Sequence, residues 1–278
     1  YYTTTLESNT PAGSIDGANI EVGTDLAANF YADVTKLTDP KMTFALGTEE
    51  AGDPVGVATD ANGSYFAFEG IPPHYMTETI TATLYDGDKV VTTLTKTIKD
   101  IAMAYLNGDY ADKVKTFAAN MLNYGAASQN YMNKNTDKLA NSDVDGYGTT
   151  NAPDASVAEG IGLSNNAGYI KSANVWFDNK NNIIVKFQNL PENAKLIVKK
   201  DGVQEFSGLA SESYKTNDLL ATELDAIYTF TIQDAEGEEL QSLTYSVNYY
   251  TYAKRNSASM GALAIALYNY GASAELVK

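Results

Sequence analysis

One short segment occurs almost twice in this chain. "MLNYGAASQ" runs from Met121 to Gln129, and "LYNYGASAE" runs from Leu267 to Glu275. Upstream of these segments, "ITATLYDGDKVVTTLTKTIKDIAMAYLN" (80–107) corresponds in pattern to "YTFTIQDAEGEELQSLTYSVNYYTYAKR" (228–255). Internal repetition of this kind indicates one supersecondary unit present in two copies. We therefore expect the same fold to be built twice.

Each copy begins with strands. Short segments alternate apolar and polar residues with period two, and Gly, Asp, Asn or Pro separate them, which is typical of antiparallel strands joined by tight turns. The expected strands are 18–22, 28–34, 43–46, 64–68 and 79–85 in the first copy, and 173–178, 183–188, 195–199, 227–233 and 240–247 in the second. The sequence predicts a mostly β fold with helices: two tandem antiparallel β-sandwich units, each followed by packed C-terminal helices.

The domain boundaries follow from the repeat. We expect an N-terminal extension at 1–11, a first repeat at 12–142, a linker at 143–157 and a second repeat at 158–278. The linker is polar and rich in turn-forming residues.

The repeated segment itself lies where the spacing becomes helical. The apolar stripe is Val114, Phe117, Ala118, Met121, Leu122 and Gly125 in the first copy, and Met260, Leu263, Ala264, Leu267 and Gly271 in the second. A glycine inside a helix costs about 1 kcal/mol relative to alanine. We expect such glycines where a neighbouring element must come close, so "NYGA" is interpreted as a packing device.

Three segments of the first copy carry a resemblance to a known family. "GANIEVGTDLAANFYADV", "MTETITATLYDGDKV" and "MLNYGAASQNYMNKNTDKLAN" resemble a repeat of secreted or cell-surface proteins of anaerobic gut Firmicutes. The second copy matches mainly in its last segment. The resemblance implies an extracellular or cell-surface location beside other modules of the same protein or assembly, with starch-adherence proteins of amylosome type as the nearest likeness. It supplies no catalytic motif.

Composition excludes several classes of partner. Lys plus Arg is 19 and Asp plus Glu is 35, a net charge of −16, and such a surface repels nucleic acid and anionic lipid. We therefore expect no nucleic-acid or membrane partner. No apolar run approaches the roughly 18 residues that span a bilayer. The absence of cysteine excludes disulfides and thiol chemistry.

No catalytic constellation is evident. The only histidine, His74, follows two prolines in an expected loop, and the chain contains no G-x-S-x-G, P-loop or H-E-x-x-H motif. We expect no enzyme.

A calcium site is the one cofactor that the spacing suggests. "DVDGYGTTNAPD" places Asp143, Asp145 and Asp154 at the first, third and twelfth positions of a loop similar to an EF-hand or dockerin loop. Tyr147 occupies the fifth position, where an oxygen ligand is expected. A linker with turn-forming residues is the alternative.

The two copies differ at one position relevant to recognition. In "ANIEV" (18–22) the alternation turns Glu21 toward solvent, and in "ANVWF" (173–177) Trp176, the only tryptophan, takes the corresponding place. An outward indole on a sheet is unusual. The alternative is that a loop or the terminal helix covers Trp176.

An outward indole beside amide and amine groups suits a sugar. The hairpin turn "DNKNN" is expected to bring Asn174, Lys186 and Gln188 close to the indole, and the first copy carries Tyr31 and Asn29 on the corresponding face. An apolar platform with a few polar groups is the usual composition of a ligand site. The leading hypothesis is non-catalytic binding of a polysaccharide or oligosaccharide, such as starch-like α-glucan, within an extracellular glycan-degrading assembly. The alternative is a structural spacer or adhesin-type module that binds no glycan.

Overall fold

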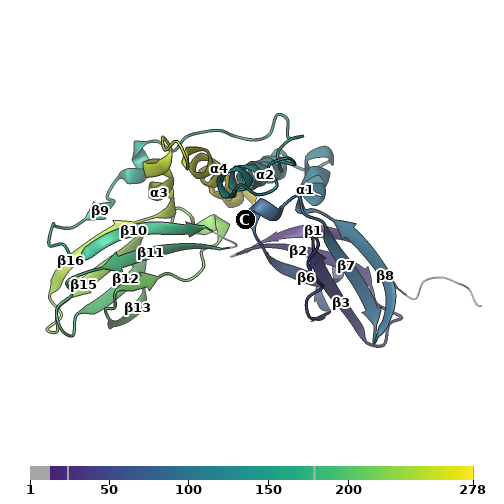
Figure 1. Cartoon of the computed structure of the whole chain (residues 1–278), viewed down its shortest axis with the longest axis horizontal. Helices are drawn as coiled ribbons and strands as arrows, with labels where there is room; N and C mark the ends of the chain where they lie inside the picture. The colour runs from purple at the N-terminus through teal and green to yellow at the C-terminus, as the bar shows by residue number, and fades with distance from the viewer. Residues whose placement is uncertain (1–12, 24, 178–179, 278) are drawn as a thin grey trace, which may run out of the picture. The chain divides into compact units, whose positions relative to one another are not determined.

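Strands are followed by helices twice along the chain in the computed structural model (Figure 1). The structure describes residues 13–23, 25–177 and 180–277. The described residues divide into two compact units, the first formed by those within 13–21, 27–69 and 77–101, and the second by those within 22–26, 70–76 and 102–277. The repeat boundaries expected from the sequence stay a prediction.

The first unit is built on two sheets with antiparallel strand pairs. Their strand orders are β1-β2-β6-β5 and β4-β3-β7-β8. The strands are β1 (Ser14–Val22), β2 (Leu26–Asp33), β3 (Pro40–Leu46), β4 (Val55–Gly56), β5 (Ala58–Asp60), β6 (Gly63–Ile71), β7 (Ile80–Asp86) and β8 (Lys89–Lys96). Phe30 of one sheet and Phe44 of the other are both buried, with ring centroids 5.3 Å apart. Apolar side chains of both sheets therefore share one core.

The strands of the second unit follow a similar order. Its sheets run β10-β11-β14 and β13-β12-β15-β16-β9. The strands are β9 (Gly162–Leu163), β10 (Ile170–Phe177), β11 (Asn181–Phe187), β12 (Lys195–Lys200), β13 (Val203–Leu209), β14 (Ser213–Lys215), β15 (Tyr228–Gln233) and β16 (Glu239–Tyr245). Tyr214 and Phe230 contact each other from the two sheets, with centroids 6.2 Å apart. The predicted mostly β fold with antiparallel pairing is confirmed.

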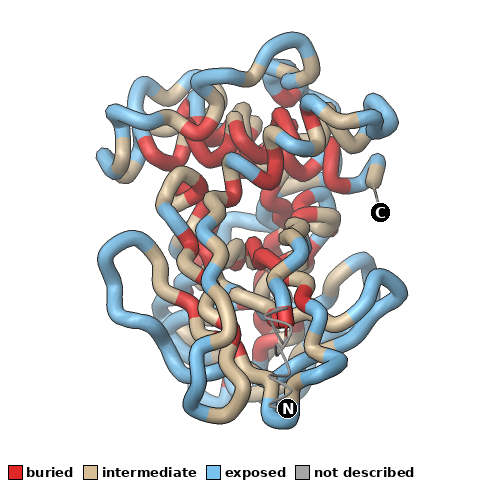
Figure 2. The backbone as a smooth tube through the Cα atoms, turned by 90° about the vertical axis from the view of Figure 1, so that its right-hand side faces the viewer, coloured by how far each residue is buried: buried red, intermediate tan, exposed pale blue. Residues whose placement is uncertain are grey.

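Helices follow the last hairpin of each half. After β8 come α1 (Ile98–Asn107) and α2 (Asp112–Met132), and after β16 come α3 (Val247–Lys254) and α4 (Gly261–Val277). Short 3₁₀ helices precede β7 (η1, Pro73–Tyr75), β9 (η2, Ala155–Ala158) and β15 (η3, Ala221–Glu223). Figure 2 shows buried positions concentrated within the helices and strands, and exposed positions at the turns. No described helix has both the length and the apolar character needed to cross a membrane.

The two "NYGA" segments meet in the second unit, where α2 packs against α4. Tyr124 and Tyr270, the tyrosines of the two motifs, stack with ring centroids 5.3 Å apart and an interplanar angle of 10°. Both are buried, and burial raises the pKa of each hydroxyl far above its usual value. Beside them, Asn120 of α2 donates through Nδ2 to the carbonyl of Asn269 in α4 at 3.2 Å.

The motif glycines make room for the segments that precede β7 and β15. A Cβ added at Gly125 would lie 2.5 Å from Sδ of Met76 and 3.2 Å from the carbonyl oxygen of Pro73. A Cβ at Gly271 would lie 2.8 Å from Cδ1 of Leu224, which follows η3. The sequence-based interpretation of "NYGA" as a packing device is therefore confirmed.

A larger side chain at Gly271 should destabilise the protein. We expect Gly271→Val to lower the free energy of unfolding by about 1–3 kcal/mol, because its methyl groups overpack the contact with Leu224. The matched control is Ala272→Val, the adjacent and exposed position of the same helix. Urea unfolding followed by circular dichroism measures both. Equal effects of the two substitutions would show that the close approach at Gly271 is unimportant.

Candidate functional site

Trp176 lies on β10 with its side chain turned to solvent. The residue is 55% exposed, whereas its neighbour Val175 is 7% exposed. Phe177 contacts Tyr250 of α3, with ring centroids 5.4 Å apart. The alternation of Val175 and Trp176 is therefore the one expected from the sequence, and the described loops and the terminal helix leave the indole 55% exposed.

The register of the hairpin defines the neighbours of the indole. Trp176 pairs with Asn182 of β11, Asn174 pairs with Ile184, and Ser172 pairs with Lys186. Residues that pair directly across antiparallel strands lie on the same face of a sheet. We call this outer face the tryptophan face. It consists of Ser172, Asn174 and Trp176 of β10, Asn182, Ile184 and Lys186 of β11, and Ser213 and Lys215 of β14.

Lys186 shares the face with the indole but lies at its far end. It is four residues from Asn182 along β11, about 13 Å at the usual rise of a strand. Gln188 lies beyond the end of β11, and its Nε2 donates to the carbonyl of Gly168 at 3.0 Å. The two residues line a separate polar hollow of about 630 Å³ together with Lys171. The expectation that Lys186 and Gln188 flank the indole is therefore wrong, whereas Asn174 is two residues from it on the same face.

Asn182, which the sequence did not single out, is the cross-strand partner of Trp176. It is 1% exposed, and its Nδ2 donates to the carbonyl of Thr216 at 3.2 Å and to Oδ1 of Asp218 at 2.8 Å. Its Oδ1 accepts no hydrogen bond from the part of the chain that the structure describes. Lys180 forms an ion pair with Asp218, with Nζ to Oδ2 at 2.9 Å. An amide, a carboxylate and an ammonium group are thus held together at this end of the hairpin.

Hydrogen bonds from Asn182 and then Lys180 hold the pKa of Asp218 below its usual value. A lowered folded-state pKa stabilises the fold above the unfolded value of about 4, and this stabilisation is lost as the pH falls through the folded value. We expect Asp218→Asn to reduce the difference in melting temperature between pH 7 and about pH 3. Lys180→Met should give part of the same change. An unaltered pH dependence in Asp218→Asn would contradict this account.

Tyr31 lies in the first unit, on β2, and its hydroxyl already has two partners. The hydroxyl donates to Oδ2 of Asp60 at 2.7 Å and accepts from Nδ2 of Asn19 at 3.1 Å. Partial burial raises the pKa of Tyr31, and the hydrogen bond from Tyr31 lowers that of Asp60. Asn29, expected beside it on the open face, is buried and donates to Glu21 at 2.8 Å. The polar side chains on this face are therefore largely hydrogen-bonded to one another.

The three aspartates of the expected calcium loop are not gathered into one site. Asp154 accepts hydrogen bonds from the backbone and hydroxyl of Ser156 at the start of η2, and these bonds lower its pKa. Asp143 accepts a hydrogen bond from the hydroxyl of Ser142, and Asp145 is exposed. Over residues 13–23, 25–177 and 180–277, no group of three or more acidic or histidine side chains is placed to hold a metal ion.

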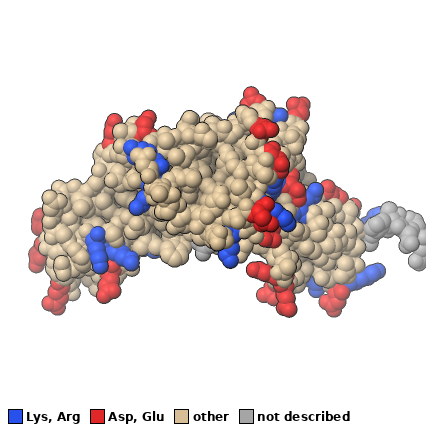
Figure 3. All heavy atoms as spheres, turned by 45° about the horizontal axis from the view of Figure 1, so that its top comes forward, with Lys and Arg blue, Asp and Glu red and all other residues tan. Residues whose placement is uncertain are grey.

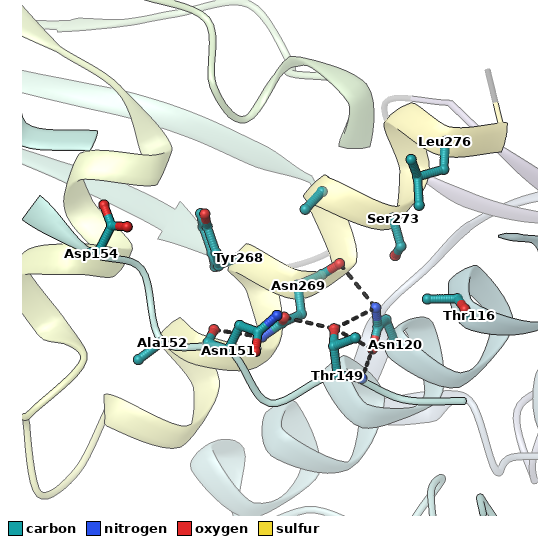
Figure 4. Close-up of a pocket in the computed structure, with 11 residues that line it drawn as sticks. Thr116, Asn120, Thr149, Asn151, Ala152, Asp154, Tyr268, Asn269, Ser273 and Leu276 are labelled. Carbon is teal, nitrogen blue, oxygen red and sulfur yellow. Dashed lines mark hydrogen bonds between the residues drawn. The ribbon is translucent and has the colours of Figure 1, made fainter. Parts of the chain in front are cut away.

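The linker forms hydrogen bonds with α2 and α4. Oγ1 of Thr149 donates to Oδ1 of Asn269 at 2.7 Å, and the backbone of Thr149 donates to Asn120 at 2.8 Å (Figure 4). Nδ2 of Asn269 donates to the carbonyl of Asn151 at 3.0 Å. These bonds border a hollow of about 540 Å³. Their donors and acceptors are mostly used within the protein, so we assign no ligand to this hollow.

Comparisons with known proteins leave the family open. No protein-family model matches the sequence, and no curated protein matches it. A solved structure titled "Cytokine receptor complex - Crystal form 1A" is similar over 82% of this chain and 96% of its own, with 8% identity and a TM-score of 0.20. A TM-score this low does not establish a shared fold or function. The resemblance to repeats of gut Firmicutes therefore stays a prediction.

Proposed function

We propose that this chain is a non-catalytic carbohydrate-binding protein that holds a neutral polysaccharide, such as a starch-like α-glucan, on its tryptophan face. The observation that carries the proposal is the chain's only tryptophan, more than half exposed on a sheet. Burying so large an apolar ring stabilises a complex, whereas exposing it in the free protein serves no packing purpose.

The groups around the indole suit a sugar. The flat ring covers the axial C–H groups of a pyranose, and Asn174 beside it offers both donors and an acceptor for hydroxyls. Ile184, across from Asn174, extends the apolar surface, and Lys215 pairs with Ile184 on β14. An open face of this kind is suited to a long chain that lies across it.

Charge favours a neutral ligand over a polyanion. Figure 3 shows acidic and basic side chains mainly along the edges of the face in view, with a broad area of other residues between them. With a net charge of −16, the protein repels polyanions at long range. A glucan carries no charge and meets no such barrier.

We also propose the wider setting. Two tandem sandwich units with helices, a first repeat at 12–142 and a second at 158–278, would form an extracellular part of a glycan-degrading assembly and lie beside other modules. This rests on the internal repeat and on the resemblance noted in the sequence. The alternative is a structural spacer or adhesin-type module that binds no glycan. It is supported by the hydrogen bonds of Thr149 and Asn151 with Asn269 of α4, since such bonds stiffen a linker.

Affinity electrophoresis separates the two functions. The protein is run through native gels that contain soluble starch, xylan, pectin or a soluble cellulose derivative, with an empty gel as reference. Retardation in at least one neutral polysaccharide supports binding. Equal mobility in every gel would leave the spacer as the better description.

A further inference from the structure

A groove lined by tyrosines lies beside the tryptophan face, within the second unit. It has a volume of about 610 Å³ and is bordered by β10, β16, β9 and α3. We call it the tyrosine groove, after Tyr245, Tyr249 and Tyr250 in its lining. Because β10 is the end strand of its sheet, the groove runs along an edge that no described strand covers. The hydroxyl of Tyr245 reaches the carbonyl of Ala173 at 3.4 Å.

Packed tyrosine rings form part of the wall of the groove. Tyr245 and Tyr250 are 7% and 5% exposed, so packing fixes their rings. Tyr249 meets Tyr245 edge-on, with centroids 5.4 Å apart and an interplanar angle of 77°, and it stays partly exposed. The ammonium of Lys254 lies over the ring of Tyr250, 5.7 Å from its centroid. Ring faces with a few polar groups are typical of sites for sugars and other small molecules.

The groove is continuous with the tryptophan face. Asn174 belongs to the tryptophan face and also lines the groove. Trp176 is two residues further along β10, about 7 Å away at the usual rise of a strand. A ligand that touches both the indole and Tyr249 must therefore be longer than one sugar ring.

We propose that the tyrosine groove is a second subsite for the same neutral glycan chain, so that the protein binds an internal stretch of a polymer rather than a single terminal sugar. This inference rests on the proposed function of the tryptophan face. None of the residues lining the groove is acidic, and Lys171, Lys254 and Asn174 supply donors for sugar hydroxyls.

Chain length is the variable that tests this inference. Calorimetric titrations with maltose and maltoheptaose compare the wild type with Tyr249→Ala and with Tyr249→Leu, which keeps apolar bulk but lacks a flat ring. We expect the wild type to bind maltoheptaose at least about tenfold more tightly than maltose, and both variants to lose about tenfold for maltoheptaose alone. Tyr110→Ala, a 48% exposed tyrosine that does not line the groove, is the control.

The results distinguish a failure of the subsite proposal from a failure of the proposed glycan binding. If Trp176→Ala weakens both sugars while Tyr249→Ala and Tyr249→Leu change neither, the proposed function stands and the groove is excluded. Equal weakening of both sugars by the Tyr249 variants also overturns the subsite, because it indicates a general change in the protein. Tighter binding of polygalacturonate than of maltoheptaose would overturn the neutral class of ligand.

Discussion

We expect Trp176→Ala to abolish retention in gels that contain the polysaccharide, because the indole is the proposed binding surface for the sugar. Covering roughly 80–100 Å² of ring at about 25 cal/mol per Å² contributes about 2 kcal/mol, which corresponds to an affinity loss of about 30-fold. The melting temperature should change little, because the side chain is 55% exposed and lies outside the core. Affinity electrophoresis and thermal unfolding of the same preparations give both values.

The control for this substitution is Leu209→Ala on β13. Leu209 is 69% exposed and does not belong to the tryptophan face, so its loss removes exposed apolar surface without touching the proposed site. Trp176→Phe should recover part of the retention, because a smaller ring still offers a flat face. Full retention of Trp176→Ala would remove the indole from the account.

Tyr270→Ala should have the largest effect on stability. Tyr270 is buried between Tyr124 and Phe117, with ring centroids 5.3 Å and 5.8 Å away. Removing a buried aromatic ring costs about 3–5 kcal/mol. For a chain of this size, we expect the melting temperature of the transition that includes α2 and α4 to fall by roughly 10 °C.

The matched control is Tyr131→Ala near the end of α2. Tyr131 is 42% exposed, so its truncation tests the loss of a tyrosine without the loss of the stack. The double substitution of Tyr124 and Tyr270 should cost less than the sum of the single ones by about 0.5–1.5 kcal/mol, because the two rings interact. Strict additivity would show that the stacked arrangement contributes nothing beyond burial.

The periodicity of the sequence predicted the mostly β class of the fold and its helices. Period-two alternation indicated most of the longer strands but missed β13 and β14, and helical spacing with an interior glycine indicated α2 and α4 together with the role of Gly125 and Gly271. These signals are local, so one sequence suffices to detect them. The stacking of Tyr124 on Tyr270 could not be predicted from the sequence, because it depends on how two helices distant in sequence pack together.

The exposure of Trp176 was also predictable, because buried and exposed side chains alternate over the end of β10, from Asn174 to Trp176. The residues that surround the indole were not predictable from the sequence. They depend on the register of the β10–β11 hairpin, and a shift of register replaces every cross-strand neighbour. Counting strand pairs outward from the hairpin turn could have identified Asn182, the last residue of "DNKNN", but the contacts of Asp218 and Lys180 leave no periodic signal in the sequence.

The aspartates of the linker show how little spacing alone says about a metal site. Their spacing is similar to a calcium loop, yet Asp154 caps η2 and Thr149 is bonded to Asn120 and Asn269. Side chains of Asp and Thr satisfy nearby backbone groups as readily as they bind metals. Spacing alone does not distinguish the two uses.

Fluorescence of the single tryptophan is the most direct measurement of the central claim, because every indole photon comes from Trp176. In the free protein, emission should be red-shifted and readily quenched by iodide. On addition of soluble amylose or another neutral polysaccharide that retards the protein in gels, emission should shift to shorter wavelength and quenching should fall. An emission spectrum and an iodide quenching constant that stay unchanged at saturating polysaccharide would contradict binding at the tryptophan face.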